Sequence, residues 1–154
     1  MSYTIRAATL SDEQNLMQLL PRLAEFEVPN NRNPKDLWFG DSELLKKALR
    51  GAVDNTDILV ATDAHDNAIA VAMYTLKPEL LSSAPSAHLE AIAVHPEHAR
   101  NGIARQLIDA CSGGARRQGA TCMSLNVFSS NVRARALYKA CGFDEELVRC
   151  YKPL

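Results

Sequence analysis

The second half of the chain alternates strand-like and helix-like segments, and this alternation limits the folds open to it. Residues 89–94 are typical of a buried strand and residues 122–127 of a further strand, and helical stretches at 103–118 and 131–141 follow them. Strands separated by helices pair in parallel, whereas hairpin strands are antiparallel. Because a hairpin precedes these units, we expect a mixed sheet covered by helices, which is an α/β (α+β) fold.

The hairpin and two further strands are predicted elsewhere in the chain. Residues 58–61 have a strand pattern, and the turn at residues 65–67 leads back into a second strand at residues 68–74. A short strand is predicted at residues 3–7 and a last one at residues 146–152. The hairpin supplies the antiparallel part of the expected sheet.

Two helices are predicted between the first strand and the hairpin. Ser11 is the expected N-cap of the first helix, with Gln14 placed to close a capping box. Pro21 is expected to kink or restart that helix, because proline lacks the backbone N–H that a helix interior needs. After a loop, Asp41 or Ser42 is expected to cap the second helix.

Composition favours one soluble domain over residues 1–154. The chain is 47% hydrophobic and 23% charged, as in ordinary globular domains. No apolar run approaches the roughly 18 residues of a membrane span, and the start lacks a signal-peptide pattern. The four cysteines lack metal-ligand spacing. We therefore expect a cytoplasmic protein with reduced thiols, no metal and no membrane partner.

Charge is distributed unevenly along the chain. Residues 1–86 carry 8 basic and 12 acidic side chains, whereas residues 87–142 carry 7 basic and 3 acidic ones. A basic second half suits an anionic ligand and an acidic first half a cationic one, although such halves also arise by chance. The net charge of −1 argues against nucleic acid as a partner, since nucleic-acid-binding domains are usually basic.

The turn between the 89–94 strand and the following helix has the features of an anion-binding site. Small residues at Gly102 and Ala104 leave backbone N–H groups bare at a helix N-terminus, which carries partial positive charge. A diphosphate fits such a turn, although an ordinary strand-to-helix connection has the same features. Neither the P-loop pattern nor the dinucleotide-binding glycine pattern is present, which argues against both nucleotide classes.

A second group of residues lies on the helix predicted at residues 131–141. Asn131, Ala134 and Tyr138 fall on one stripe of that helix. A tyrosine at this position can present its hydroxyl to a leaving group, and packing of its ring in the core is the alternative.

Together these two groups resemble the GNAT superfamily of N-acetyltransferases over residues 87–143. The order and spacing that carry the resemblance are Leu89-Glu90-x-x-x-Val94, the Arg100-Asn101-Gly102-Ile103-Ala104 turn, and Asn131-x-x-Ala134-x-x-Leu137-Tyr138-x-x-x-Gly142-Phe143. Ala99 departs from the pattern, since the first position of the turn is usually arginine or glutamine. The family holds pyrophosphate mostly through the backbone, so we expect binding to survive, with Arg100 supplying the lost charge.

The resemblance implies a three-layer α/β/α fold whose central twisted sheet is split by a V-shaped opening between the 89–94 and 122–127 strands. It also implies acetyl-CoA as co-substrate, with pantetheine paired to the edge of the 89–94 strand like an added strand. The residues then expected to bind it are Ile92, Ala93, Val94, Ala99, Arg100, Asn101, Gly102, Ile103, Ala104, Arg105 and Asn131.

Catalytic roles also follow from the resemblance. In the family a bulge in the first of these strands frees a backbone N–H for the acetyl carbonyl, and Ile92 is the expected donor. A base must remove a proton from the amine, and Glu90 matches the position that serves as base in some members. His88 lies two residues earlier, and water is a third route. Tyr138 is expected to protonate the departing CoA thiolate.

These features predict an enzyme that moves an acetyl group from acetyl-CoA to a primary amine by direct attack in a ternary complex. The acceptor can be a small cationic amine or a protein amine, and a homodimer is possible. The alternative is a catalytically weak, CoA-binding GNAT-like sensor. In that case Ala99 reflects partial loss of the family's binding motif. The carboxylates placed to attract a cationic acceptor are Glu25, Glu27, Asp36, Asp41 and Glu43.

Overall fold

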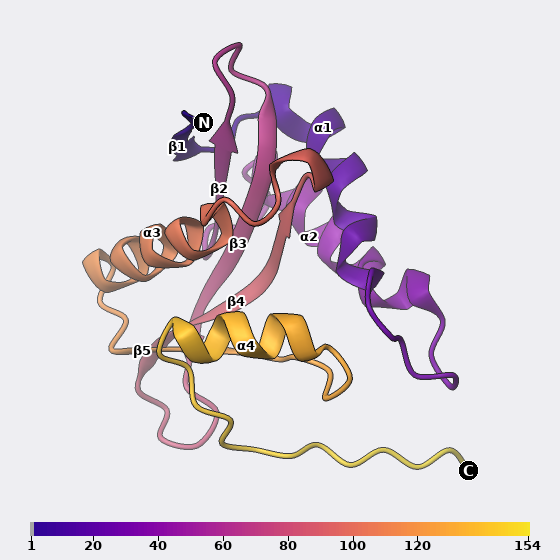
Figure 1. Ribbon diagram of the computed structural model, residues 1–154. Coiled ribbons are helices and arrows are strands. Elements are labelled where there is room, and N and C mark those ends of the chain that lie inside the picture. The colour runs from indigo at the N-terminus through magenta and orange to yellow at the C-terminus, as the bar shows by residue number, and fades with distance from the viewer. Residues whose placement is uncertain (1) are drawn as a thin grey trace.

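The computed structural model describes residues 2–154 and contains one five-stranded sheet in sequence order (Figure 1). The strands are β1 (Thr4–Ala7), β2 (Thr56–Thr62), β3 (Ala68–Pro78), β4 (Pro85–Val94) and β5 (Cys122–Leu125). Neighbours from β1 to β4 are antiparallel, and β4 pairs with β5 in parallel. The predicted mixed sheet is therefore confirmed.

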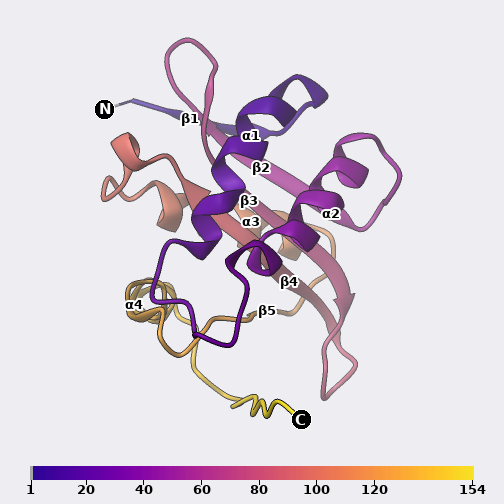
Figure 2. The ribbon, with the colours of Figure 1, turned by 90° about the vertical axis from the view of Figure 1, so that its right-hand side faces the viewer.

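Helices cover both faces of the sheet and give three layers (Figure 2). The helices are α1 (Glu13–Leu19), α2 (Phe39–Leu49), α3 (Ile103–Arg117) and α4 (Val132–Ala140), with 3-10 turns at Leu10–Asp12, Leu20–Ala24, Pro34–Leu37 and Pro96–His98. Helices α1 and α2 lie on one face, and α3 and α4 on the other. No helix within residues 2–154 is long and apolar enough to cross a membrane.

Two apolar cores hold the layers together, one on each face of the sheet. Leu16 and Leu45 pack beneath α1 and α2, and Leu107 packs beneath α3. Strand β3 contributes to both, since Met73 faces the first core and Tyr74 the second. This burial on both faces explains why β3 has a continuous apolar run rather than an alternating pattern.

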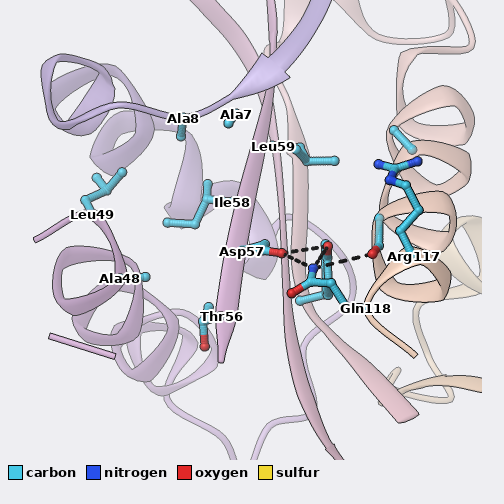
Figure 3. A pocket seen from close by; sticks show the side chains of 13 residues that line it. Ala7, Ala8, Ala48, Leu49, Thr56, Asp57, Ile58, Leu59, Arg117 and Gln118 are labelled. Atoms are coloured by element: carbon cyan, nitrogen blue, oxygen red, sulfur yellow. Dashed lines mark hydrogen bonds between the residues drawn. The ribbon is translucent and has the colours of Figure 1, made fainter. Parts of the chain in front are cut away.

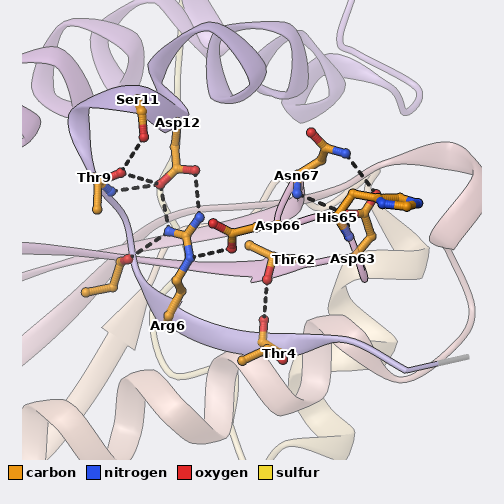
Figure 4. Close-up of polar contacts among 11 residues, drawn as sticks. Thr4, Arg6, Thr9, Ser11, Asp12, Thr62, Asp63, His65, Asp66 and Asn67 are labelled. Carbon is orange, nitrogen blue, oxygen red and sulfur yellow. Dashed lines mark hydrogen bonds and ion pairs between the residues drawn. The ribbon is translucent and has the colours of Figure 1, made fainter.

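The first helical segment begins earlier than predicted, and the cap expected at Ser11 with Gln14 is wrong. The capping box is formed by Thr9 and Asp12, whose carboxylate accepts the Thr9 backbone N–H at 2.7 Å. Arg6 also binds this carboxylate at 2.8 Å (Figure 4), and its hydrogen bond lowers the pKa of Asp12. Because Arg6 of β1 binds the Asp12 carboxylate, Asp12 is the acidic residue of the capping box.

The other helix boundaries agree in part with expectation. Helix α1 ends at Leu19, and the chain continues as a 3-10 turn that contains Pro21, so the restart predicted there is confirmed. Helix α2 begins at Phe39, so the predicted caps Asp41 and Ser42 are wrong. The Ser42 hydroxyl donates to the Phe39 carbonyl at 2.6 Å and thus lies inside the first turn.

Strands β4 and β5 separate after a short pairing, as the predicted V-shaped opening requires. The pairing runs from Ser86 opposite Cys122 to Leu89 opposite Leu125. Beyond it β5 ends, whereas β4 continues to Val94 while still paired with β3 on its other edge. One edge of β4 is therefore free within the opening.

The last strand predicted, at residues 146–152, is wrong. Residues 143–154 have no regular secondary structure, and this tail leaves the end of α4 without joining the sheet (Figure 1). A strand pattern becomes a strand only when its backbone groups find a partner, and no described strand pairs with the tail.

Two glycines in the middle of α3 have different surroundings. A Cβ at Gly114 would lie 2.6 Å from the Tyr74 hydroxyl oxygen, whereas one at Gly113 would lie 3.4 Å from the mobile end of Arg117. The Tyr74 hydroxyl donates to Asp57 at 2.8 Å and accepts from Gln118 at 3.1 Å (Figure 3). Gly114 therefore allows α3 to approach a buried polar group.

We expect Gly114→Ala to lower the free energy of unfolding by about 1–3 kcal/mol, because Tyr74 must move and lose its partners. The matched variant Gly113→Ala should be neutral or stabilising by up to about 1 kcal/mol, since alanine favours a helix. Urea denaturation of both variants measures the difference. Equal effects of the two substitutions would contradict the packing explanation.

Candidate active site

A bulge in β4 determines the shape of the site. Met73 of β3 pairs with Ala91, and the next residue, Tyr74, pairs with Leu89, so Glu90 is an extra residue in β4. Leu89 belongs to the core beneath α3, and Ala91 belongs to the core beneath α1 and α2. The bulge thus shifts the alternation of the strand at Glu90, beside the opening.

The backbone after the bulge directs hydrogen-bonding groups into the opening. The His95 N–H donates to the Ile69 carbonyl at 2.8 Å, so these two residues form a hydrogen-bonded pair of the antiparallel ladder. Such pairs alternate with pairs whose N–H and C=O groups point away from the partner strand. Ile92, opposite Ala72, and Val94 are at the alternate positions. Their N–H groups therefore point away from β3, towards the free edge.

The turn that follows β4 leaves further donors uncovered. Arg100 and Gly102 both adopt left-handed conformations, with φ of 65° and 76°, and Gly102 is the N-cap of α3. The first helical bond joins the Gln106 N–H to the Gly102 carbonyl at 3.1 Å. The N–H groups of Ile103 and Ala104 precede this first bond and therefore have no acceptor within the helix. This arrangement at a helix N-terminus suits an anion.

His88 lies on β4 before the bulge and is held by β5. Its Nδ1 atom forms a 2.8 Å hydrogen bond with the hydroxyl of Ser124, its register partner. Burial lowers the pKa of His88, as does the charge of Lys77, whereas Glu90 opposes them. The imidazole is therefore neutral near pH 7.

Asp41 and Glu90 form a pair of carboxyl groups on the α2 side of the sheet. Asp41 lies in the first turn of α2 and is half-buried. Burial raises the pKa of Asp41 to about 7, and the negative charge of Glu90 contributes to the increase. His88 also interacts with Glu90. The two carboxyl groups and the neutral imidazole thus belong to one electrostatic cluster.

Tyr138 and Asn131 lie on α4, on the opposite face of the sheet from α2. The Asn131 side chain accepts the Ala134 N–H at 3.3 Å and caps the helix. The Tyr138 ring packs edge-to-face on Phe143, with centroids 6.0 Å apart. Burial and the neighbouring Cys141 raise the pKa of Tyr138 to about 12. Its hydroxyl is therefore protonated at neutral pH and can donate a proton.

Comparison with known proteins identifies the family of this arrangement. A sequence model described as the acetyltransferase (GNAT) family matches residues 18–143. The chain belongs to the GNAT acetyltransferase family. The resemblance read from the sequence and the predicted GNAT fold are both confirmed.

Individual relatives found by sequence match only part of this GNAT chain. The ribosomal protein bS18-alanine N-acetyltransferase of Escherichia coli K12 is 36% identical over 58 residues, and the match covers 38% of this chain and 39% of that enzyme. N-alpha-acetyltransferase 40 of Saccharomyces cerevisiae is 40% identical over 68 residues, which is 40% of this chain and 24% of the yeast protein. The chain thus matches well under half the length of these relatives.

Solved structures match over nearly the whole chain. Aminoglycoside N-acetyltransferase AAC(6')-Iy, in complex with the bisubstrate analogue CoA-S-monomethyl-acetylneamine, superposes with a TM-score of 0.74 at 23% identity and covers 100% of this chain and 99% of its own. Ribosomal-protein-alanine N-acetyltransferase from Brucella melitensis biovar Abortus 2308 gives a TM-score of 0.72 at 20% identity, with 99% of both chains covered. At these identities the similarity shows the shared GNAT fold.

Some of the residues predicted for the GNAT site lie close together in the structure, and others do not. Glu90, His88 and Asp41 form one cluster. Glu25 and Glu43 instead pair with Arg22 and Lys46 on their own helical segments, at 2.7 and 3.2 Å. Sequence reasoning missed Ser124, because its contact with His88 depends on the parallel register of β4 and β5. The strand pattern of residues 122–127 carries no signal of that register.

The residues of the opening fit CoA chemically. Free N–H groups on β4 suit an amide-containing pantetheine arm, and the uncovered donors at the start of α3 suit its pyrophosphate. Exposed Arg100 and Arg105 add positive charge at the same helix end. Among residues 2–154, no group of three or more His, Cys, Asp or Glu side chains is placed to hold a metal ion.

A separate pocket of about 390 Å³ lies where β2 extends past the end of β1 (Figure 3). It contains the polar group of Asp57, Tyr74 and Gln118, whose Nε2 atom donates to Asp57 at 2.6 Å. None of the predicted site residues lines it. These hydrogen bonds fix β2, β3 and α3 together, so we assign the group a structural role.

The carboxyl pair gives a titration that can be measured. We expect carboxyl-carbon NMR to show Asp41 titrating near pH 7, well above the ordinary value for aspartate. Because the folded state binds this proton more tightly than the unfolded state, the free energy of unfolding should fall as the pH rises from about 4 to about 7.

Two variants test this assignment. Glu90→Gln should lower the midpoint of Asp41, because it removes a neighbouring negative charge. Asp41→Asn should remove the corresponding part of the pH dependence of stability. An Asp41 midpoint near 4 in the folded protein would contradict the carboxyl pair.

Proposed function

We propose that the chain transfers an acetyl group from acetyl-CoA to a primary amine. The observation that carries the proposal is the free edge of β4, where the Ile92 N–H points away from β3 just before the uncovered N-terminus of α3. One donor directed at the acetyl carbonyl and several at an anion are what a CoA thioester requires. Membership of the GNAT family supports the same reaction.

Binding of the co-substrate is assigned to main chain more than to side chains. The backbone from Ile92 through Ala93 to Val94 pairs with pantetheine, and the amides of residues 99–104 hold the pyrophosphate. Ala99 contributes only its amide, and Arg100 and Arg105 contribute charge. Asn131 contacts pantetheine or the terminal phosphate arm in addition to capping α4. This division explains how alanine at position 99 is compatible with binding.

The chemistry needs a neutral amine, because an ammonium ion has no lone pair. Glu90 takes a proton from the bound ammonium group, and the resulting neutral nitrogen attacks the thioester carbonyl carbon. The new C–N bond forms as the C–S bond breaks, and negative charge on the carbonyl oxygen is stabilised by the Ile92 N–H. The departing thiolate takes its proton from Tyr138, and the proton that the acylated nitrogen loses restores the tyrosine hydroxyl. His88 and water remain alternative routes for the first proton.

The acceptor we propose is a cationic amine. The carboxyl groups of Asp41 and Glu90 lie together on the α2 side, in the acidic half of the chain, and an ammonium group would neutralise them. Some of the matched proteins are named as aminoglycoside N-acetyltransferases and others as ribosomal-protein-alanine N-acetyltransferases. Both kinds of amine are positively charged in water, which is consistent with the carboxyl pair.

The first experiment is calorimetric titration with acetyl-CoA followed by an assay of thiol release with a panel of amines. The panel should include an aminoglycoside, a polyamine and a peptide with an N-terminal alanine. Binding with thiol release on one class supports the enzyme and identifies its acceptor. Binding without release on any amine supports the sensor alternative, and absence of binding would refute both.

Removing the proposed acid should reduce turnover without loss of binding. We expect Tyr138→Phe to lower kcat by about 100-fold or more, with the Kd for acetyl-CoA changed little. Tyr3→Phe is the matched control, because the Tyr3 hydroxyl is buried without a hydrogen-bond partner in the described chain and lies on the β1 side. A Tyr138→Phe enzyme with unchanged kcat would exclude the proposed acid.

Distorting the turn should affect binding of acetyl-CoA specifically. Alanine at Gly102 must adopt a φ of 76°, which strains the backbone that presents the α3 donors, so we expect at least about tenfold weaker binding. Gly51→Ala is the control, since Gly51 has a φ of 69° and open space around it but lies after α2. Calorimetry should show weaker binding only for Gly102→Ala.

A further inference from the structure

The pocket of about 390 Å³ beside Asp57 lies on the β2 side of the sheet, whereas the opening proposed for acetyl-CoA lies between β4 and β5 (Figure 3). Its lining includes residues from the ends of α2 and α3, among them Leu49 and Arg117. The C-terminal end of a helix carries partial negative charge, because its last carbonyl groups have no partner within the helix. Two such ends beside the Asp57 carboxylate make this part of the pocket suitable for a cation.

Two opposite charges line the pocket without neutralising each other. Asp57 accepts both of its hydrogen bonds through Oδ2, and its Oδ1 atom has no partner within residues 2–154. The Arg117 guanidinium forms no ion pair with any residue that the structure describes. It folds back over Gly113 and Gly114, with its nitrogens 3.4 and 3.7 Å from the positions that Cβ atoms would occupy there. An acid and a base that share a pocket but do not pair leave both charges available to a ligand.

The main chain of β2 adds a hydrogen-bond donor and an acceptor. The Ala8 N–H donates to the Ile58 carbonyl at 2.9 Å, so the main-chain groups of Ile58 face β1. Residues two apart in a strand face the same edge, so the N–H and C=O groups of Thr56 point to this edge as well. Strand β1 ends at Ala7, before it could pair with Thr56, which lines the pocket. A ligand there can therefore pair with the edge of β2 as a further residue of β1 would.

We propose that this pocket is a second binding site, which takes a free α-amino acid with an apolar side chain. The ammonium group pairs with Asp57 Oδ1 near the two helix ends, and the carboxylate pairs with Arg117. The volume of about 390 Å³ is typical of a site for a small molecule. The ligand's side chain packs on the apolar part of the lining, which comes from Ala7, Ala8, Ala48, Leu49 and Ala110. The proposal does not depend on the proposed acetyl transfer.

Titration of the full chain with L-leucine, followed by amide NMR, tests the proposal. The amide signals of Thr56 and Gln118 should shift and reach saturation below about 10 mM ligand, whereas that of Gly102 should not move. Two analogues separate the charges, since 3-methylbutylamine lacks the carboxylate and 4-methylpentanoate lacks the ammonium group. We expect each analogue to bind at least about tenfold more weakly than leucine, because it leaves Arg117 or Asp57 unpaired.

Arg117→Gln removes the charge that is expected to hold the carboxylate. Leucine should bind this variant at least about tenfold more weakly, and no better than 3-methylbutylamine does. Arg116→Gln is the matched control, because Arg116 is also exposed near the end of α3 but does not line the pocket. Both side chains are exposed, so both variants should fold, and their amide spectra check this. Absence of saturable shifts would overturn the proposal, as would equal binding of leucine and 3-methylbutylamine to the unmodified protein, or equal binding of leucine by the two variants.

Discussion

The extra residue at Glu90 in β4 is the constraint on which the site depends. Without the extra residue, the side chains of β4 would alternate regularly between the two faces, and Leu89 and Ala91 would face the same core. With it, Leu89 and Ala91 face opposite cores, and Glu90 comes near Asp41. Beyond this position β4 continues without β5, and the Ile92 N–H points into the opening. One inserted residue thus positions both a carboxyl group and a backbone donor.

Features that depend on local sequence were predictable. The strand, turn and helix around Gly102 follow from small residues at a helix start. The restart at Pro21 follows from its missing N–H. In each case the physical cause lies within a few residues of its effect, so reading along the chain is sufficient.

Features that depend on distant partners were not predictable. The capping box uses Asp12 because Arg6 binds it, and Ser124 contacts His88 only through the β4–β5 register. Helix propensity alone gives no reason for Gly114, whose neighbour Tyr74 is on β3. The tail failed as a predicted strand for the same reason, since a strand needs a partner that its own residues do not specify.

The carboxyl pair couples proton balance to ligand binding. Near neutral pH, Asp41 is only partly ionised, because burial and Glu90 both disfavour a second negative charge. Any cation that binds beside the pair stabilises the ionised form and expels the proton from Asp41. Uptake of a positively charged molecule at this position therefore releases acid to the solvent, and the heat of that binding depends on the ionisation enthalpy of the buffer.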